Sequence, residues 1–244
     1  MNIVISQHQA EIRLIHNIGN LFWIQSKNLE VLNKHNYKIL LEKFNKIVIQ
    51  KDFEIQSNTS KTKENLNIFL NLSVLDLVKR KYIFNKSLVD YKMINKSRFE
   101  YKSISNFSKN DVFNIFSDVI KGDSDMNLEA KEEFDGLIEM TEDESYKENW
   151  KIVLKDNVKI GMLLPHKYKD ATNEGTLLYI GLVPEFRSKG FAQEIHSQGL
   201  QFLKENKVEK YYGSTMKTNK AMLKVFEKNK CELVNEQLFY KFAN

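Results

Sequence analysis

The stretch from residue 176 to 205 constrains the fold more than any other part of the chain. An apolar segment typical of a strand ends at Val183-Pro184, a short basic loop with one glycine follows at once, and an amphipathic helical pattern begins after the loop. Strand, loop and helix in this order, with further strands and helices on both sides, predict helices flanking a mixed sheet. The expected fold class is therefore α/β or α+β.

The loop itself predicts an anion site. It reads Arg187-Ser188-Lys189-Gly190-Phe191-Ala192. A helix N-terminus leaves backbone N–H groups unpaired and carries a partial positive charge, so a loop that approaches closely can bind a pyrophosphate. Gly190 has no Cβ to block the backbone, Ala192 is small where the helix begins, and Arg187 and Lys189 add positive charge.

The elements around this loop follow from local signals. Ser108 with Asp111 three residues later predicts a helix start, and Gly122 predicts its end. Asp156-Asn157 between two alternating segments predicts a hairpin turn. The other expected elements are a strand near residues 98 to 101, a helix at 128 to 138, a strand at 176 to 183, a strand at 208 to 214, a helix at 219 to 228, and two closing strands around 232 to 234 and 238 to 242.

With Asn219 and Met222 after the next strand, this order resembles the GNAT superfamily of N-acetyltransferases over residues 98 to 244. The resemblance implies a mixed, mostly antiparallel sheet flanked by helices, and a domain at 96–244 that uses acetyl-CoA or another acyl-CoA without a metal. It also implies the cofactor-binding residues. Backbone groups of Leu182 and Val183 would pair with the pantetheine arm, and Asn219 would contact it. The loop amides of Arg187, Ser188, Lys189, Gly190, Phe191 and Ala192 would hold the pyrophosphate.

The chemistry implied by the resemblance is direct transfer of an acyl group from the CoA thioester to a primary amine. Glu174, just before the strand, is the best-placed candidate for the catalytic base, and Tyr179 could orient water or substrate, although a surface turn and core packing are their ordinary roles. Many members carry a tyrosine seven residues after the asparagine, where this chain has Phe226. Either the thiolate leaves without a dedicated acid, or Ser214 substitutes, or catalysis is lost.

The charge pattern suggests the acceptor. Residues 96 to 150 hold 7 basic and 14 acidic side chains, whereas the segments on both sides are basic. An acidic lining would attract a cationic amine, so we expect a small amino compound as partner, although a solvated acidic face is the simpler interpretation. The acidic residues at the centre of this block are Asp123, Asp125, Glu129, Glu132, Glu133 and Asp135.

Residues 1–95 carry no catalytic motif. Apolar positions from Leu29 to Val48 and from Leu66 to Tyr82 predict a mostly helical region, with a polar loop at residues 51 to 63. No repeat of fixed period is visible in the sequence. The region is interpreted as an accessory or degenerate part: a second copy of the fold, a cover for the substrate, or an element that makes a homodimer.

The remaining features exclude classes of protein. Cys231 is the only cysteine, so no intramolecular disulfide can form; it falls where a core residue is expected, and we interpret it as a buried thiol. No segment has the pattern of a signal peptide or a membrane span, which predicts a cytoplasmic protein with no membrane partner. The lysines of residues 1–95 are dispersed, so no nucleic-acid partner is expected. The rival functions are a CoA-binding protein without turnover and an RNA-linked aminoacyl transferase of tandem type.

Overall fold

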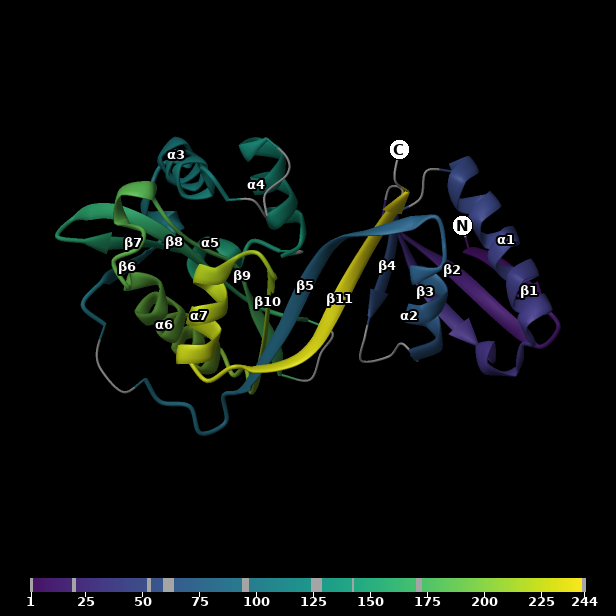
Figure 1. Cartoon of the computed structure of the whole chain (residues 1–244). Helices are drawn as coiled ribbons and strands as arrows, with labels where there is room; N and C mark the ends of the chain where they lie inside the picture. Colours follow the sequence, from purple (N-terminus) through teal and green to yellow (C-terminus); the bar gives the residue numbers. More distant parts are fainter. Residues whose placement is uncertain are drawn as a thin grey trace. The chain divides into compact units, whose positions relative to one another are not determined.

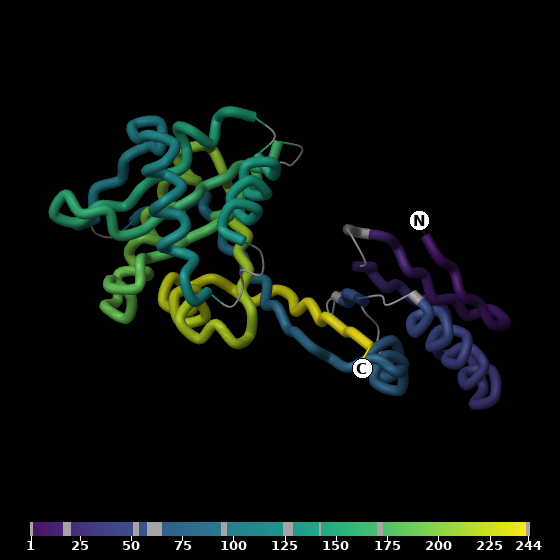
Figure 2. The backbone as a smooth tube through the Cα atoms, turned by 90° about the horizontal axis from the view of Figure 1, so that it is seen from above, coloured from purple at the N-terminus to yellow at the C-terminus, as the bar shows by residue number. Residues whose placement is uncertain are grey.

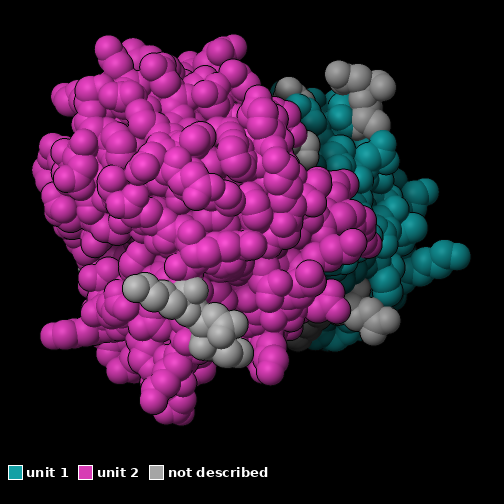
Figure 3. All heavy atoms as spheres, turned by 90° about the vertical axis from the view of Figure 1, so that its left-hand side faces the viewer, with its two compact units in different colours: residues 1–83, 234–244 teal, residues 84–233 magenta. Residues whose placement is uncertain are grey.

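The computed structural model describes residues 2–18, 21–51, 54–58, 64–93, 97–123, 129–141, 143–169 and 173–242. The chain forms two compact units, which Figure 3 shows in two colours: residues 1–83 with 234–244, and residues 84–233. Both chain ends thus belong to unit 1 (Figure 2). The last strand begins in unit 2 and ends in unit 1, and a functional boundary between residues 95 and 96 stays a prediction.

Unit 1 begins with three antiparallel strands, followed by a helix, a strand parallel to the third, a second helix and a long strand (Figure 1). Its strand order is β1-β2-β3-β4-β11-β5. The core forms because Ile12 and Leu14 of β2 alternate toward Leu40 and Phe44 of α1. The bounds are β1 (Asn2–Gln7), β2 (Ala10–Ile18), β3 (Leu21–Lys27), η1 (Leu29–Val31), α1 (Lys34–Lys51), β4 (Glu54–Asn58), α2 (Glu64–Asn71) and β5 (Leu75–Ser87).

The expectation that residues 1–95 are mostly helical is wrong. Five strands occupy more of the described residues than the two helices do. The predicted helix at 66–82 ends at Asn71, and a strand begins at Leu75. The predicted loop at 51–63 contains β4, and its other residues beyond Lys51 lie outside the described part. The period-two burial of β2 and β3 is the physical reason, since each strand buries one face only.

Unit 2 has the strand order β10-β9-β8-β7-β6. Helix α3 packs on one face against Met162 and Leu164 of β8, and α6 packs on the other face, where its Gly199 lies against Leu163. The bounds are β6 (Glu100–Ser103), η2 (Ile104–Asn106), α3 (Lys109–Ile120), α4 (Ala130–Glu139), α5 (Tyr146–Asn149), β7 (Lys151–Lys155), β8 (Val158–Lys167), β9 (Glu174–Leu182), η3 (Pro184–Phe186), α6 (Phe191–Glu205), β10 (Lys210–Met216), α7 (Lys220–Lys228) and β11 (Glu232–Phe242).

The predicted fold class is confirmed: the sheet is mixed and mostly antiparallel, with seven α-helices in the described part of the chain. Local signals explain this success. The Ser108 hydroxyl accepts a hydrogen bond from the Asp111 amide at 3.1 Å, and Asp156 and Asn157 have φ of 51° and 63° in the predicted turn. The two closing strands expected after residue 231 are one strand, β11.

The two parts of the chain share one order of elements. Three antiparallel strands, a 3₁₀ turn, a helix, a strand parallel to the third, a helix and a long strand occur from β1 to β5, and again from β7 to β11. The sequence showed no repeat because the two halves share a pattern of elements rather than residues.

Candidate functional site

A cavity of about 440 Å³ in unit 2 lies where β9, its following loop, α7 and the end of α3 meet. Five of the residues predicted to bind a cofactor line this cavity: Leu182, Arg187, Ser188, Ala192 and Asn219. Four others do not line it: Val183, Lys189, Gly190 and Phe191. The lining residues are Val119, Gly122, Asp123, Tyr179, Ile180, Gly181, Leu182, Arg187, Ser188, Ala192, Thr218, Asn219, Lys220, Ala221, Met222 and Val225.

One edge of β9 opens into this cavity. The parallel ladder between β9 and β10 comprises only the three pairs that end at Thr176 and Tyr212, although both strands continue beyond them. On its other edge β9 stays paired with β8 as far as Leu182. The two strands therefore part at the cavity, as a backbone that is to pair with a ligand requires.

The alternation of antiparallel pairing identifies the groups on this edge. The Val183 amide donates to the Ile160 carbonyl oxygen of β8 at 3.0 Å, so Val183 faces β8 and its amide is already used. Neighbouring residues of a strand present their backbone groups to opposite edges, which turns those of Leu182 and Ile180 toward the cavity. Of the two residues that the resemblance pairs with the pantetheine arm, Leu182 therefore faces the cavity and Val183 does not, whereas Ile180 does.

The loop before α6 has the backbone that a close anion needs. Ser188 and Gly190 have φ of 60° and 76°, and Gly190 is the N-cap of α6. A Cβ built on Gly190 would meet nothing within 4 Å, so the glycine serves the left-handed backbone and leaves the approach to the helix open. The first amides of α6 have no acceptor inside the helix.

Besides its positive charge, Arg187 contributes hydrogen bonds to two backbone carbonyl oxygens. Its Nε donates to the Leu182 carbonyl oxygen at 2.9 Å, and its Nη2 donates to the Val119 carbonyl oxygen at 2.9 Å. Val119 lies in the last turn of α3, where carbonyl groups lack helical partners and a positive charge is favourable. Arg187 therefore fixes the end of β9 to the end of α3.

Three other predicted residues have structural contacts. The Lys189 ammonium lies 5.0 Å from the centre of the Phe186 ring, and Phe191 packs edge-on against Phe99. Asn219 caps α7, because its Oδ1 accepts a hydrogen bond from the Met222 amide at 3.1 Å. Asn219 lines the cavity as well, whereas the Lys189 and Phe191 side chains do not.

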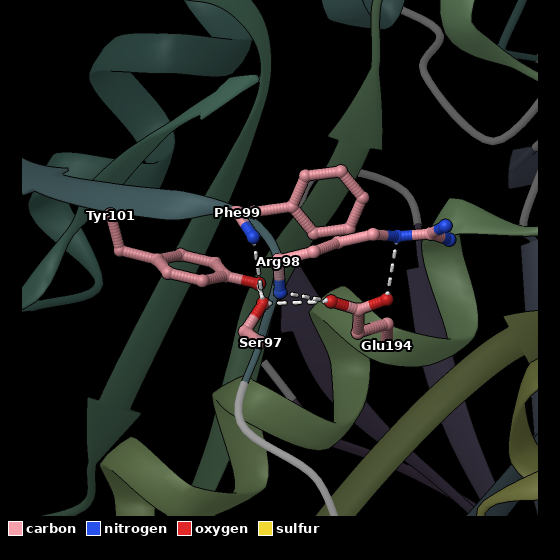
Figure 4. A network of polar contacts seen from close by, with 5 residues as sticks. All are labelled: Ser97, Arg98, Phe99, Tyr101 and Glu194. Atoms are coloured by element: carbon pink, nitrogen blue, oxygen red, sulfur yellow. Dashed lines mark hydrogen bonds and ion pairs between the residues drawn. The ribbon is translucent and has the colours of Figure 1, made fainter. Parts of the chain in front are cut away.

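A polar network holds the first turn of α6 from the other side (Figure 4). The Glu194 carboxylate accepts hydrogen bonds from the Ser97 hydroxyl at 2.9 Å and the Arg98 amide at 2.7 Å, and it pairs with Arg98 Nε at 3.0 Å. The Arg98 guanidinium also lies over the rings of Phe99 and Phe191. The negative charge of Glu194 near the helix N-terminus is thereby compensated.

A buried chain of hydrogen bonds joins α6, β10 and α7. His196 Nδ1 lies 2.8 Å from Asn229 Nδ2, and its Nε2 lies 3.1 Å from the Tyr211 hydroxyl. Asn229 also accepts from the Ser197 hydroxyl. Burial, with a smaller contribution from Lys86, lowers the pKa of His196 to about 3. The imidazole is therefore neutral, and it has a structural role.

The remaining predicted residues lie away from the cavity. Glu174 is the first residue of β9 and accepts a long hydrogen bond from Tyr212. Leu182 stands at the other end of β9, roughly 26 Å along the strand. Phe226 is buried against Phe84, with ring centres 4.4 Å apart. Cys231 is a buried free thiol whose pKa burial raises to about 12, which confirms its expected core position.

A carboxylate and a phenol meet inside the cavity. The Tyr179 hydroxyl lies 3.0 Å from Asp123 Oδ2 and 3.1 Å from the Val119 carbonyl oxygen. No sequence signal joins two residues that are 56 positions apart. In the acidic block, Asp125 lies outside the described residues. Glu129, Glu132 and Glu133 lie at the start of α4, and Asp135 lies in its middle.

Within the described ranges, no group of three or more His, Cys, Asp or Glu side chains could hold a metal ion. No helix in that part of the chain is long and apolar enough to span a bilayer.

Three solved structures of similar fold are a GCN5-related N-acetyltransferase from Sphaerobacter thermophilus (8% identity, TM-score 0.67, 97% of this chain and 78% of that chain), a tandem GNAT protein from the clavulanic acid biosynthesis pathway (8%, 0.58, 96% and 79%), and a GNAT-family acetyltransferase from Colwellia psychrerythraea (11%, 0.59, 95% and 81%). No curated protein matches the chain. The family model of the acetyltransferase (GNAT) domain matches residues 108–232, just over half of the 244 residues. The chain therefore belongs to the GNAT acetyltransferase family.

Proposed function

We propose that the protein transfers an acyl group, with acetyl-CoA as donor, to a primary amine of a small cationic acceptor. The observation that carries the proposal is the parting of β9 and β10 at Thr176, which opens the backbone of Ile180 and Leu182 into a cavity beside the start of α6. An extended amide-containing arm could pair with that edge, as a strand would.

The described residues fit the donor. The backbone of Ile180 and the amide of Leu182, whose carbonyl oxygen already accepts from Arg187, would hold the arm. The positive-φ loop at Ser188 and Gly190 would hold the pyrophosphate at the helix N-terminus. Lys220 of α7 lines the same cavity and would add a positive charge. The thioester supplies an activated carbonyl carbon, and the cavity walls would exclude water from it.

The acceptor class follows from charge. Asp123 lines the cavity. Glu132 and Glu133, in the first turn of α4, belong to the same acidic block at residues 96 to 150. These carboxylates would attract a cationic amine in preference to an acidic compound. A cytoplasmic location is part of the proposal, because a lone cysteine suits a reducing compartment.

The experiment is acetyl-CoA binding to the full chain by calorimetry, followed by thiol release in the same preparation. The acceptors would be diamines, aminoglycosides and amino-acid amides, with ethylene glycol as the control without an amine. Binding with amine-dependent thiol release is the expected result. Binding without release for any amine would favour the CoA-binding protein, a reading that the buried Phe226 supports; no binding would end the proposal.

We also infer that unit 1 is a degenerate second copy of the fold. Its elements follow the order of those in residues 151–242, and β3 and β4 part after three parallel pairs, as β9 and β10 do. Only Leu32 and Asn33 separate η1 from α1, where Arg187 to Gly190 separate η3 from α6. Because this described connection is shorter and has no glycine, we expect no pyrophosphate site before α1.

A further inference from the structure

The geometry points to Asp123 as the catalytic carboxylate that binds the acceptor's ammonium group and takes its proton, with Tyr179 as its positioning residue. This inference deepens the proposed function and rests on it. Asp123 is the only carboxylate among the described residues that line the cavity. The charged lining residues besides it, Arg187 and Lys220, are cations with no acceptor atom for an ammonium proton.

Position along β9 favours this pair over Glu174. Tyr179 directly precedes Ile180, the residue whose backbone groups face the cavity, whereas Glu174 stands at the far end of the strand and does not line it. Asp123 follows the end of α3, the helix that packs on the same face of the sheet as Tyr179. The carboxylate therefore stands beside the open edge where the thioester would lie.

Several contacts hold the pair in place. The Tyr179 hydroxyl bridges Asp123 Oδ2 and the Val119 carbonyl oxygen, and Arg187 Nη2 donates to the same carbonyl oxygen. A Cβ on Gly181 would come within 2.6 Å of the Tyr179 ring, so the glycine allows the ring to lie along the strand. A side chain held this firmly can present a carboxylate in one geometry.

The transfer step moves the acyl group from the CoA sulfur to the acceptor nitrogen. The ammonium group gives one proton to the Asp123 carboxylate, and the lone pair of the resulting amine forms the N–C bond at the thioester carbonyl carbon. The C–S bond then breaks, and its electron pair leaves with the CoA sulfur. The second proton lost by the nitrogen ends on that sulfur, so the products are an amide and CoA thiol. Asp123 returns its proton to solvent.

The test compares Asp123→Asn with Glu205→Gln, an exposed carboxylate at the far end of α6 whose loss changes the net charge equally. With acetyl-CoA and the best amine of the panel, we expect Asp123→Asn to lower kcat about 100-fold. Its acetyl-CoA affinity by calorimetry should stay within about twofold of wild type, and Glu205→Gln should match wild type in both.

Tyr179→Phe provides the second measurement, because it keeps the ring and removes only the hydroxyl. We expect kcat to fall about tenfold and the KM for the amine to rise, with acetyl-CoA affinity unchanged. A wild-type kcat in Asp123→Asn would overturn the inference while leaving the proposed function intact. If acetyl-CoA binds but no amine causes thiol release with the wild-type chain, the inference and the transfer step are overturned together. Absent acetyl-CoA binding would instead refute the proposed function at its donor site.

Discussion

At the scale of single residues, adding a Cβ atom at Gly190 would have two effects, one on the backbone conformation and one on ligand binding. Its φ of 76° costs an L-residue about 1 kcal/mol, although an added Cβ would meet nothing within 4 Å. We therefore expect Gly190→Ala to lower the free energy of unfolding by about 1 kcal/mol and to weaken acetyl-CoA binding about tenfold, because the methyl group stands at the pyrophosphate approach.

Gly136→Ala is the matched control, since that Cβ also meets nothing within 4 Å but the helical backbone of α4 accepts alanine. It should raise the unfolding free energy by about 0.5–1 kcal/mol without changing affinity. Urea unfolding and calorimetry measure both quantities. Equal acetyl-CoA affinity in Gly190→Ala and wild type would contradict the assigned loop.

His196 makes stability depend on pH. Burial lowers the pKa of His196 to about 3 in the folded chain, whereas an unfolded histidine titrates near 6.5. Asn229 Nδ2 donates to Nδ1 of the ring, so a proton there would remove the acceptor. Between these two values the unfolded chain binds one more proton than the folded chain does. Stability from this residue is therefore complete above pH 6.5 and is lost as the pH falls toward 3.

The slope is at most about 1.4 kcal/mol per pH unit. Urea unfolding at several pH values should show a decline in the free energy of unfolding below pH 6.5 that is shallower in His196→Gln, because that variant has no ring to protonate. Comparing slopes removes any constant loss of stability that the variant carries. Parallel profiles for the two proteins would contradict this assignment.

Residue roles were only partly predictable from sequence. Leu182, Ser188, Ala192 and Asn219 line the cavity as a local motif suggests, because strand, loop and helix are consecutive in the chain. The contact of Arg187 with Val119 spans 68 positions, and no local pattern carries it. Contacts of that range depend on how α3 packs on the sheet.

At the scale of elements, the capped helix α3 and the hairpin of β7 and β8 were predictable because their signals are local. The strands of unit 1 were not, although Ile12 and Leu14, and again Phe22 and Ile24, show period-two burial. Each such run is short, and a few apolar residues fit a helix face as well as a strand. Pairing with neighbouring strands decides between them.

The first turn of α6 is an element whose charge can be tested. Arg98 compensates Glu194 there, next to the proposed pyrophosphate site. We expect Arg98→Ala to weaken acetyl-CoA binding about threefold, because it removes a cation and exposes a like charge to the phosphates. The loss should shrink at high salt. Glu194→Gln in the Arg98→Ala background should restore most of the affinity.

A purely structural role for the pair would give another pattern. In that case both single variants would lower the unfolding free energy, and acetyl-CoA affinity would not depend on which charge was removed. Calorimetry of the two single variants and the double variant, at low and high salt, distinguishes these outcomes.

At the scale of the whole molecule, the order of elements occurs twice, which poses the question of how many acyl-CoA molecules one chain binds. Two copies of the fold could hold two acyl-CoA molecules, but the connection from η1 to α1 is two residues, Leu32 and Asn33, and has no glycine. Among the described connections that lead into a helix, only the loop at Arg187 to Gly190 in unit 2 has positive φ at two positions. We therefore expect one acetyl-CoA per chain in calorimetry, and none in Gly190→Trp, whose indole would fill the approach to α6. A wild-type stoichiometry of two, or one remaining site in the variant, would show that unit 1 binds the donor despite its short loop and that the copy is functional.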